Sequence, residues 1–271
     1  MSDDLWGTDR LDLPAYLERI GRTEPPGPSR EALEELYDAH LRTFTFDNID
    51  VLLDQHPGVD LPDVQAKFVG RGRGGYCFEH GTLFAAVLDR LGYAVERRLA
   101  RVGDPTAAGR THLVAAVDLG GERLLADPGF GLSVWRPIPL VDGAVDEMGG
   151  ITHRVRRGEF GWALERAKGD GWELMHTHDE ALVVPVDVAI GHHYTSTHPT
   201  VHFRHRLITT KLLADRHVSL THNTVTIRRE GQETEHREIG LDEVMAYLEE
   251  LEVPLTDDER VRLRERLASL D

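Results

Sequence analysis

The chain has 271 residues and a formal net charge of −16 at pH 7, which argues against a nucleic-acid partner because a binder of phosphate backbones needs clustered positive charge. A single cysteine excludes an internal disulfide, and we find neither a signal peptide nor a run of about 18 apolar residues that would predict a membrane span. We therefore expect a cytoplasmic protein without a membrane partner. The sequence leaves the oligomeric state open, and a homo-oligomer is compatible with it.

Residues 1–92 are predicted to form a helical domain. Helix signals cover residues 14–21, the stretch from the N-cap Ser29 to about 42, a short segment beginning near 62, and a stretch from Cys77 to 92. In the last of these, apolar residues recur at helical spacing and give one apolar stripe. We expect these helices to pack as a bundle.

Cys77 is the only cysteine, and it follows a glycine-rich turn that also contains two arginines, Arg71 and Arg73. A lone cysteine is more often a small buried apolar residue without chemistry. Here, however, the predicted helix begins at the thiol, so unpaired backbone N–H groups and the helix dipole would favour a thiolate. The surroundings of Cys77 therefore predict that its thiol acts as a nucleophile.

Residues 93–188 change to short alternating segments separated by glycine turns, which predicts an antiparallel sheet curling into a small barrel. Within it, Gly120-Gly121 reads as the two-residue turn of a hairpin. That register places Val114 opposite Asp127 and puts His112 diagonally across from Asp127 on the same face, about 7–8 Å away at the backbone. An imidazole and a carboxylate can close this gap, so the hairpin predicts a His–Asp pair that can act on Cys77.

Residues 189–271 are predicted to form a third, α/β domain. Strands are expected over 203–211, 218–229 and 233–239, and helices over 241–251 and from Thr256. Thr256 to Glu259 forms a capping box, which fixes the start of the final helix.

The order Cys77, His112, Asp127 is shared by transglutaminase-like enzymes and several acyl-transferring relatives. Three blocks here closely resemble the signatures of the arylamine N-acetyltransferase family, with further matches between residues 14 and about 205. The blocks are Arg73-Gly-Gly-Tyr-Cys77-Phe-Glu79, Thr111-His112-Leu113 and Leu125-Ala-Asp127-Pro-Gly-Phe-Gly131. The resemblance implies an α+β fold with an N-terminal helical bundle, a central antiparallel β-barrel and a C-terminal α/β lid on a cysteine-protease-like core.

The resemblance also implies an enzyme of xenobiotic metabolism that takes an acetyl group from acetyl-CoA onto Cys77 and passes it to an arylamine, a hydrazine or an N-hydroxyarylamine. Acetyl-CoA would be a co-substrate, and no permanent cofactor or metal is expected. By resemblance, four residues are implied to shape the substrate or CoA site: Phe130, Gly131, Thr195 and Ser196. Three aromatic residues could supply a wall for an arylamine ring: Phe46, Tyr76 and Phe130.

Five positions depart from the family pattern. Thr45 and Asp47 stand where the family usually has Pro and Glu, which shortens a carboxylate expected to pair with Arg73. His80 and Gly81 replace an amide-bearing or apolar residue and an asparagine. Pro128 is also less usual than an apolar residue. These departures leave Cys77, His112 and Asp127 intact and bear on local packing and acceptor preference.

Two other functions remain open from the sequence. An amide synthase on the same scaffold would close a macrolactam, and the three reactive residues cannot distinguish it from an acetyltransferase. A non-catalytic binding module could also retain the fold. An anionic cofactor such as CoA would need basic residues concentrated near the site, and the candidates, which could equally form a solvated rim, are Arg71, Arg73, Arg97, Arg98, Arg101 and residues 154–157.

Overall fold

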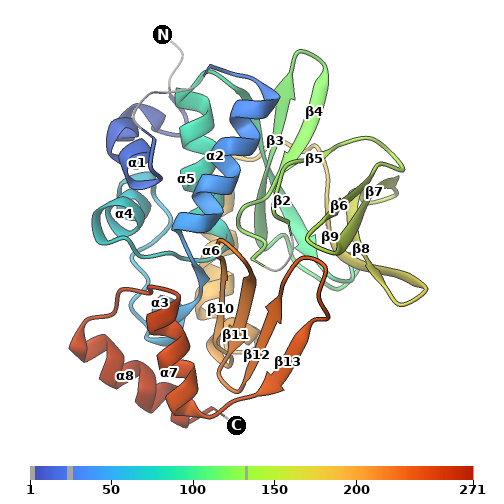
Figure 1. The fold of residues 1–271 in the computed structure, drawn as a ribbon. Helices are drawn as coiled ribbons and strands as arrows, with labels where there is room; N and C mark the ends of the chain where they lie inside the picture. The colour runs from blue at the N-terminus through green and yellow to red at the C-terminus, as the bar shows by residue number, and fades with distance from the viewer. Residues whose placement is uncertain (1–3, 23–26, 132–133, 271) are drawn as a thin grey trace.

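The structure is a computed structural model that describes residues 4–22, 27–131 and 134–270. Its N-terminal part is helical (Figure 1). The elements are η1 (Thr8–Arg10), α1 (Leu13–Arg19), α2 (Arg30–Thr43), α3 (Ile49–Leu52), α4 (Leu61–Gln65), the π-helical turn η2 (Ala66–Gly70) and α5 (Cys77–Arg90). Ser29 caps α2 as predicted, because its hydroxyl accepts a hydrogen bond from the backbone N–H of Ala32 at 3.1 Å.

The middle of the chain forms an eight-stranded antiparallel sheet that curls into a nearly closed barrel, which confirms the predicted fold class. The strand order is β5-β4-β3-β2-β9-β8-β7-β6. The strands are β2 (Ala94–Val102), β3 (His112–Leu119), β4 (Glu122–Ala126), β5 (Ile138–Pro139), β6 (Val145–Met148), β7 (Ile151–Gly158), β8 (Gly161–Lys168) and β9 (Gly171–His178). This order places β2 between β3 and β9, which matters for the site.

The C-terminal part contains a second sheet of order β1-β10-β11-β12-β13, covered by two helices. Its elements are β10 (Ile208–Leu212), β11 (His217–Thr221), β12 (Thr224–Arg228), β13 (Glu235–Glu238), α7 (Leu241–Glu250) and α8 (Asp257–Ala268). The short strand β1 (Phe46–Asp47) comes from the N-terminal part and pairs with β10. The capping box at Thr256 is confirmed, since its hydroxyl accepts from the N–H of Glu259.

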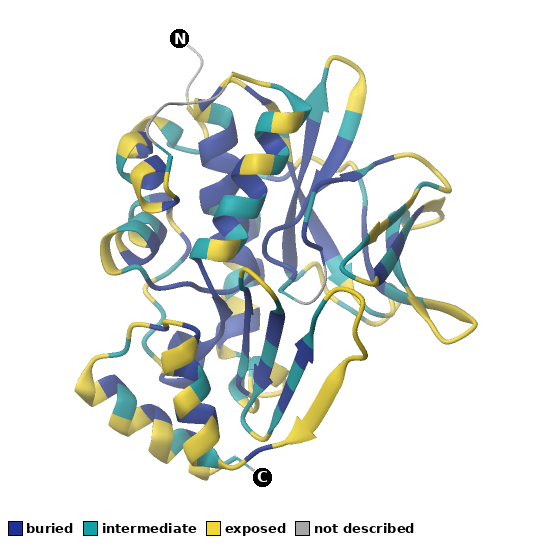
Figure 2. Cartoon of the chain, in the orientation of Figure 1, coloured by how far each residue is buried: buried dark blue, intermediate teal, exposed yellow. Residues whose placement is uncertain are grey.

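Two elements of this region differ from the sequence prediction. The stretch 218–229 is two strands rather than one, because Thr221 makes hydrogen bonds to Asn223 and Thr224 that turn the chain between β11 and β12. Helix α6 (Pro185–Thr197) was not predicted at all. Part of α6 is exposed (Figure 2), and its exposed side chains include Val186, Ile190 and Tyr194, which hides the usual amphipathic pattern.

The helices and the barrel share one large hydrophobic core, in which Tyr37 and Phe84 of the helices lie with Val117 and Leu125 of the barrel. The C-terminal sheet and its helices bury a separate core.

We propose to keep the division into three domains, with the second boundary moved before Pro185 because α6 runs across residues 188 and 189. Among the described residues, no helix is both long and apolar enough to cross a bilayer.

Candidate active site

Cys77 is the first residue of α5, as the sequence predicted. The side chain of Glu79 accepts the backbone N–H of Tyr76 at 3.0 Å, so it caps the helix start just before the thiol. Gly75 permits this cap, since a Cβ there would lie 2.2 Å from a Glu79 carboxylate oxygen. Cys77 is 4% exposed, and its sulfur lies 3.8 Å from the carbonyl oxygen of Thr111.

His112 and Asp127 form the predicted pair. The hairpin register aligns Ala115 with Ala126, which leaves His112 and Asp127 diagonal at the open end of β3 and β4. Nε2 of His112 lies 2.7 Å from Oδ2 of Asp127, and both side chains are buried. Cys77 and His112 line the same cavity, and the thiol is one of the groups that raise the pKa of the His112 ring. The structure therefore brings the three side chains together in the order Cys77, His112, Asp127.

The electrostatics of the pair favour a charged histidine. Burial alone would lower the pKa of His112, but the charge of Asp127 and the hydrogen bonds to Asp127 and Cys77 raise it to about 10. Burial alone would likewise raise the pKa of Asp127, but the two histidines beside it hold this pKa well below its usual range. An imidazolium beside a carboxylate is thus the stable state at neutral pH.

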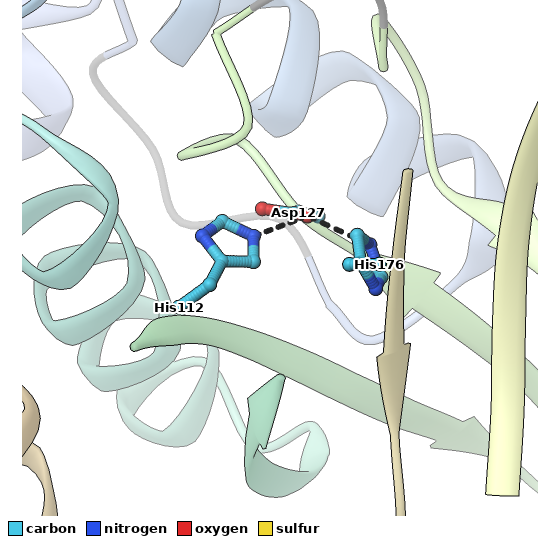
Figure 3. A group of neighbouring side chains, drawn as sticks. All are labelled: His112, Asp127 and His176. Carbon is cyan, nitrogen blue, oxygen red and sulfur yellow. Dashed lines mark hydrogen bonds and ion pairs between the residues drawn. The ribbon is translucent and has the colours of Figure 1, made fainter. Parts of the chain in front are cut away.

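A second buried histidine, His176, contacts the same carboxylate and was missed by the sequence analysis. Its Nε2 lies 3.3 Å from Oδ2 of Asp127, opposite His112 (Figure 3). It arrives there because β9 pairs with the other edge of β2, and Ala100 is flanked by His112 on one side and His178 on the other. The available signal was the alternation His176-Thr177-His178, which puts both rings on one face of a strand.

The group of His112, Asp127 and His176 also has the composition of a metal site, with ligand atoms within 4.8 Å of one another. A metal would have to bind Nε2 of His112, which already shares a proton with Asp127 over 2.7 Å. With the pKa of His112 raised to about 10, that proton stays in place at neutral pH. The electrostatics therefore favour the proton over an ion.

A cavity of about 340 Å³ opens over Cys77 and His112. Of the residues expected to bind substrate, four line it: Phe46, Phe130, Gly131 and Thr195. Tyr76 and Ser196 do not belong to the lining of this cavity. The Tyr76 hydroxyl points to Nδ1 of His192 at 2.5 Å, and the ring packs against Phe203. The hydroxyl of Ser196 donates to the carbonyl of His193 on its own helix.

Arg73 is fully buried, but its ion pairs are not those expected. Its guanidinium contacts Asp50 at 2.9 Å and Glu259 of α8 at 3.2 Å, whereas Asp47 accepts hydrogen bonds from the Thr45 hydroxyl and the Ile49 backbone. The shortened Asp47 carboxylate is held by these neighbours and makes no ion pair with the guanidinium, although the two charges still interact through space. The charge of Arg73 is therefore used within the protein and is not directed at Cys77.

The other basic residues that might have received CoA phosphates are mostly neutralised too. Arg71 pairs with Glu259, Arg97 with Asp89, and Arg98 with Glu96. Arg154, Arg156 and Arg157 pair with Glu165, Asp142 and Glu180 respectively. Arg97 and Arg98 are buried. For the other four arginines, the pairs favour the interpretation of a rim of mixed charge.

The departures at residues 80 and 81 have local structural reasons. His80 is buried and turned away from the cavity, with Nδ1 2.8 Å from Nε2 of His40 and Nε2 3.1 Å from the carbonyl of Thr45. Gly81 lets α5 pack closely on β3, because a Cβ there would lie 2.8 Å from the side chain of Leu113. Both residues thus belong to the support of α5 and do not line the cavity.

The fold and this site define the class of protein. It is a cysteine-protease-like α+β protein in which a cysteine is the first residue of a buried helix and lies beside a His–Asp pair. A family model described as N-acetyltransferase matches residues 29–258. An arylamine N-acetyltransferase of Mycolicibacterium smegmatis is 34% identical over 240 residues, covering 83% of this chain and 85% of that protein. The chain belongs to the arylamine N-acetyltransferase family.

Solved structures agree with this assignment. The arylamine N-acetyltransferase from Mycobacterium abscessus superposes with a TM-score of 0.90 at 35% identity, covering 99% of each chain. The enzyme from Mycobacterium marinum in complex with CoA gives a TM-score of 0.86 at 30% identity, covering 94% of this chain and 98% of that one.

Proposed function

We propose that the protein transfers an acetyl group from acetyl-CoA, through a thioester on Cys77, to the nitrogen of arylamines, hydrazines or N-hydroxyarylamines. The observation that carries the proposal is the thiol of Cys77 at the floor of a cavity, next to a histidine whose other nitrogen is held by Asp127. The names of the relatives and the CoA complex of one of them support the donor and the acceptor class.

In the first half-reaction, the thiolate of Cys77 attacks the thioester carbon of acetyl-CoA. The new C–S bond forms as the bond to the CoA sulfur breaks, and the leaving CoA thiolate takes the proton of the His112 imidazolium. Because one thioester replaces another, this step is close to neutral in free energy. His112 ends the step as a neutral ring, oriented by Asp127 through Nε2.

In the second half-reaction, the lone pair of the amine nitrogen attacks the acetyl carbon on Cys77. Neutral His112 accepts the proton that the nitrogen loses, and the C–S bond breaks to restore thiolate and imidazolium. An amide replaces a thioester, so this step is downhill. The buried Asp127 carboxylate stabilises the imidazolium at the end of each cycle without taking the proton.

The test is to incubate the protein with acetyl-CoA alone and measure its intact mass, then to add a panel of arylamines and hydrazines and follow release of free CoA thiol. We expect a gain of one acetyl group on Cys77, its loss on adding an amine, and neither event in the Cys77→Ala variant. No adduct and no thiol release would refute the proposal and favour a binding module. Turnover only with large acyl thioesters would favour an amide synthase.

A further inference from the structure

Helix α6 contacts both residues that flank the nucleophile in the chain. Tyr76 and Phe78, on either side of Cys77, are both fully buried. Gly191 of α6 packs so closely on Phe78 that a Cβ at position 191 would lie 2.8 Å from its ring. The next residue, His192, has its Nδ1 atom 2.5 Å from the hydroxyl of Tyr76. Cys77 is thus held between two residues that each contact α6.

The contact between Tyr76 and His192 is one link in a closed ring of side chains. The imidazole of His192 lies 4.4 Å from that of His56, measured between ring centroids. Nε2 of His56 lies 3.1 Å from Glu79, and the same carboxylate oxygen accepts the backbone N–H of Tyr76 at 3.0 Å. The proton of His56 is on Nε2, facing Glu79, because Nδ1 accepts the backbone N–H of Gly58 at 3.1 Å. Both the backbone and the hydroxyl of Tyr76 are therefore fixed.

The hydrogen bond between Tyr76 and His192 joins two groups that are neutral at pH 7. Burial lowers the pKa of His192 to about 4 and raises the pKa of the Tyr76 hydroxyl well above its usual range. A buried hydroxyl without a hydrogen-bond partner is unfavourable, and His192 is the partner that this hydroxyl has in the structure. The bond is therefore present throughout the neutral pH range.

Helix α6 also forms part of the wall of the cavity over Cys77. Tyr194 and Thr195 line this cavity, and they follow His192 within one turn of the helix. At the other end of the hydrogen bond, Tyr76 is the N-cap residue of α5. One hydrogen bond thus joins the cavity wall to the residue before the nucleophile, and without it the two could shift relative to each other.

On the basis of the proposed function, we infer that His192 is a positioning residue for acetyl transfer. Its hydrogen bond to Tyr76 keeps the sulfur of Cys77 beside His112 and facing the cavity. His192 is absent from the described residues that line the cavity, so it acts on the reaction only through Tyr76. A displacement of the reacting atoms by about 1 Å can lower a rate by up to about a hundredfold, so a small shift of the thiol should be measurable.

The test measures how fast acetyl-CoA acetylates Cys77 in a single turnover, followed by intact mass. His192→Leu and Tyr76→Phe should each lower this rate about tenfold. Both remove the same hydrogen bond, so the double variant should lose no more than about tenfold, whereas independent effects would multiply. His192→Asn should restore most of the rate, because its amide can make the hydrogen bond in place of Nδ1. The matched control is His193→Leu, at the exposed neighbouring position on α6, which should leave the rate unchanged.

A second measurement does not require acetyl transfer. The rate at which iodoacetamide alkylates Cys77 at pH 6 is divided by the rate at pH 9, and this ratio should fall about threefold or more in His192→Leu. A thiol farther from the His112 imidazolium is less ionised at pH 6, whereas a residue that only stabilises the fold would leave the ratio unchanged in the folded protein. An unchanged ratio would overturn the inference. If the wild type takes up no acetyl group, the proposed function fails, but this ratio still tests the position of the thiol.

Three further results would overturn the inference. One is a rate of acetylation in His192→Leu equal to that of the wild type, and another is a double variant whose loss is the product of the two single losses. The third is a loss that His192→Asn does not restore, because contact of the imidazole with His56 would then cause the effect. Should urea unfolding show that His192→Leu does not fold, Tyr76→Phe gives the same test, since its ring keeps its packing against Phe203.

Discussion

Asp127 Oδ2 lies between two buried histidines, 2.7 Å from Nε2 of His112 and 3.3 Å from Nε2 of His176. Burial lowers the pKa of His176, so this ring is neutral at pH 7, while the ring of His112 is charged. Neither nitrogen of His176 has another hydrogen-bond partner among the described residues. His176 is thus placed to hold the carboxylate while His112 exchanges protons.

For each protein, the rate at which iodoacetamide alkylates Cys77 at pH 6 is divided by the rate at pH 9. We expect this ratio to be about tenfold lower in His176→Leu than in the wild type. The physical reason is that a donor to a charged carboxylate contributes about 1.5–3 kcal/mol, and without it Asp127 is less well oriented toward His112. His176→Asn, which keeps an N–H donor, should restore part of the rate. If both variants fold and give the wild-type pH profile, His176 has only a packing role.

Asp127→Asn should remove the charge that sustains the His112 imidazolium. The pKa of His112, raised to about 10 by the carboxylate, should then fall, because burial alone lowers it. Alkylation of Cys77, which we expect to be fast and nearly constant from pH 6 to 9 in the wild type, should in the variant rise only toward the range of a free thiol, about pH 8.5. A variant that still alkylates rapidly at pH 6 would contradict the thiolate–imidazolium pair.

The sequence could predict only those parts of the site whose interacting residues lie close together along the chain. The Gly120-Gly121 turn sets a register over a few residues, so His112 and Asp127 could be paired from the sequence alone. The partners of Arg73 could not, because Glu259 is 186 positions away and reaches it only through the packing of α8. The same limit applies to His176, which depends on β2 pairing with both β3 and β9. The direction of the Tyr76 side chain depends on His192 of α6, an element that the sequence did not reveal.

A buried chain of hydrogen bonds makes the protein sensitive to acid. Thr45 O can only accept, so Nε2 of His80 carries the proton, Nε2 of His40 donates to Nδ1 of His80, and the Tyr16 hydroxyl donates to His40. Both rings are therefore neutral. Burial lowers the pKa of His80 to about 4 and holds that of His40 well below its usual value.

Below about pH 6.5 these two histidines are protonated in the unfolded chain but stay neutral in the folded protein. The free energy of unfolding should therefore fall as the pH drops from 6.5 to 4. We expect the loss of unfolding free energy between pH 7.5 and pH 5, measured by urea unfolding, to be about 1–2 kcal/mol smaller in His80→Gln than in the wild type. His236→Gln, at an exposed site on β13, is the control and should leave the difference unchanged. Equal acid sensitivity of His80→Gln and wild type would show that His80 titrates normally.

Lys67 neutralises two buried carboxylates, with Nζ 2.7 Å from Asp50 and 2.7 Å from Glu79. Lys67→Met would leave Asp50 paired with Arg73 alone and Glu79 with His56 alone. Breaking a buried ion pair costs about 3–5 kcal/mol. We expect a loss of this size in urea unfolding. Lys168→Met removes an exposed ion pair with Glu173 and should cost less than about 1 kcal/mol. Similar small losses in both variants would show that the buried cluster contributes little to stability.

Gly129 holds the loop after Asp127 against the nucleophile. A Cβ at this position would lie 2.8 Å from both the Cα and the carbonyl oxygen of Cys77, and neither backbone atom can move without shifting the start of α5. Gly129→Ala should therefore displace Cys77 from His112 and lower acetyl transfer at least tenfold, at a cost of about 1–3 kcal/mol in stability. Gly158→Ala is the matched control, since no atom lies within 4 Å of a Cβ there. The rate of acetyl transfer and the free energy of unfolding in urea are measured for both variants. Full activity of Gly129→Ala would mean that the loop does not set the position of the thiol.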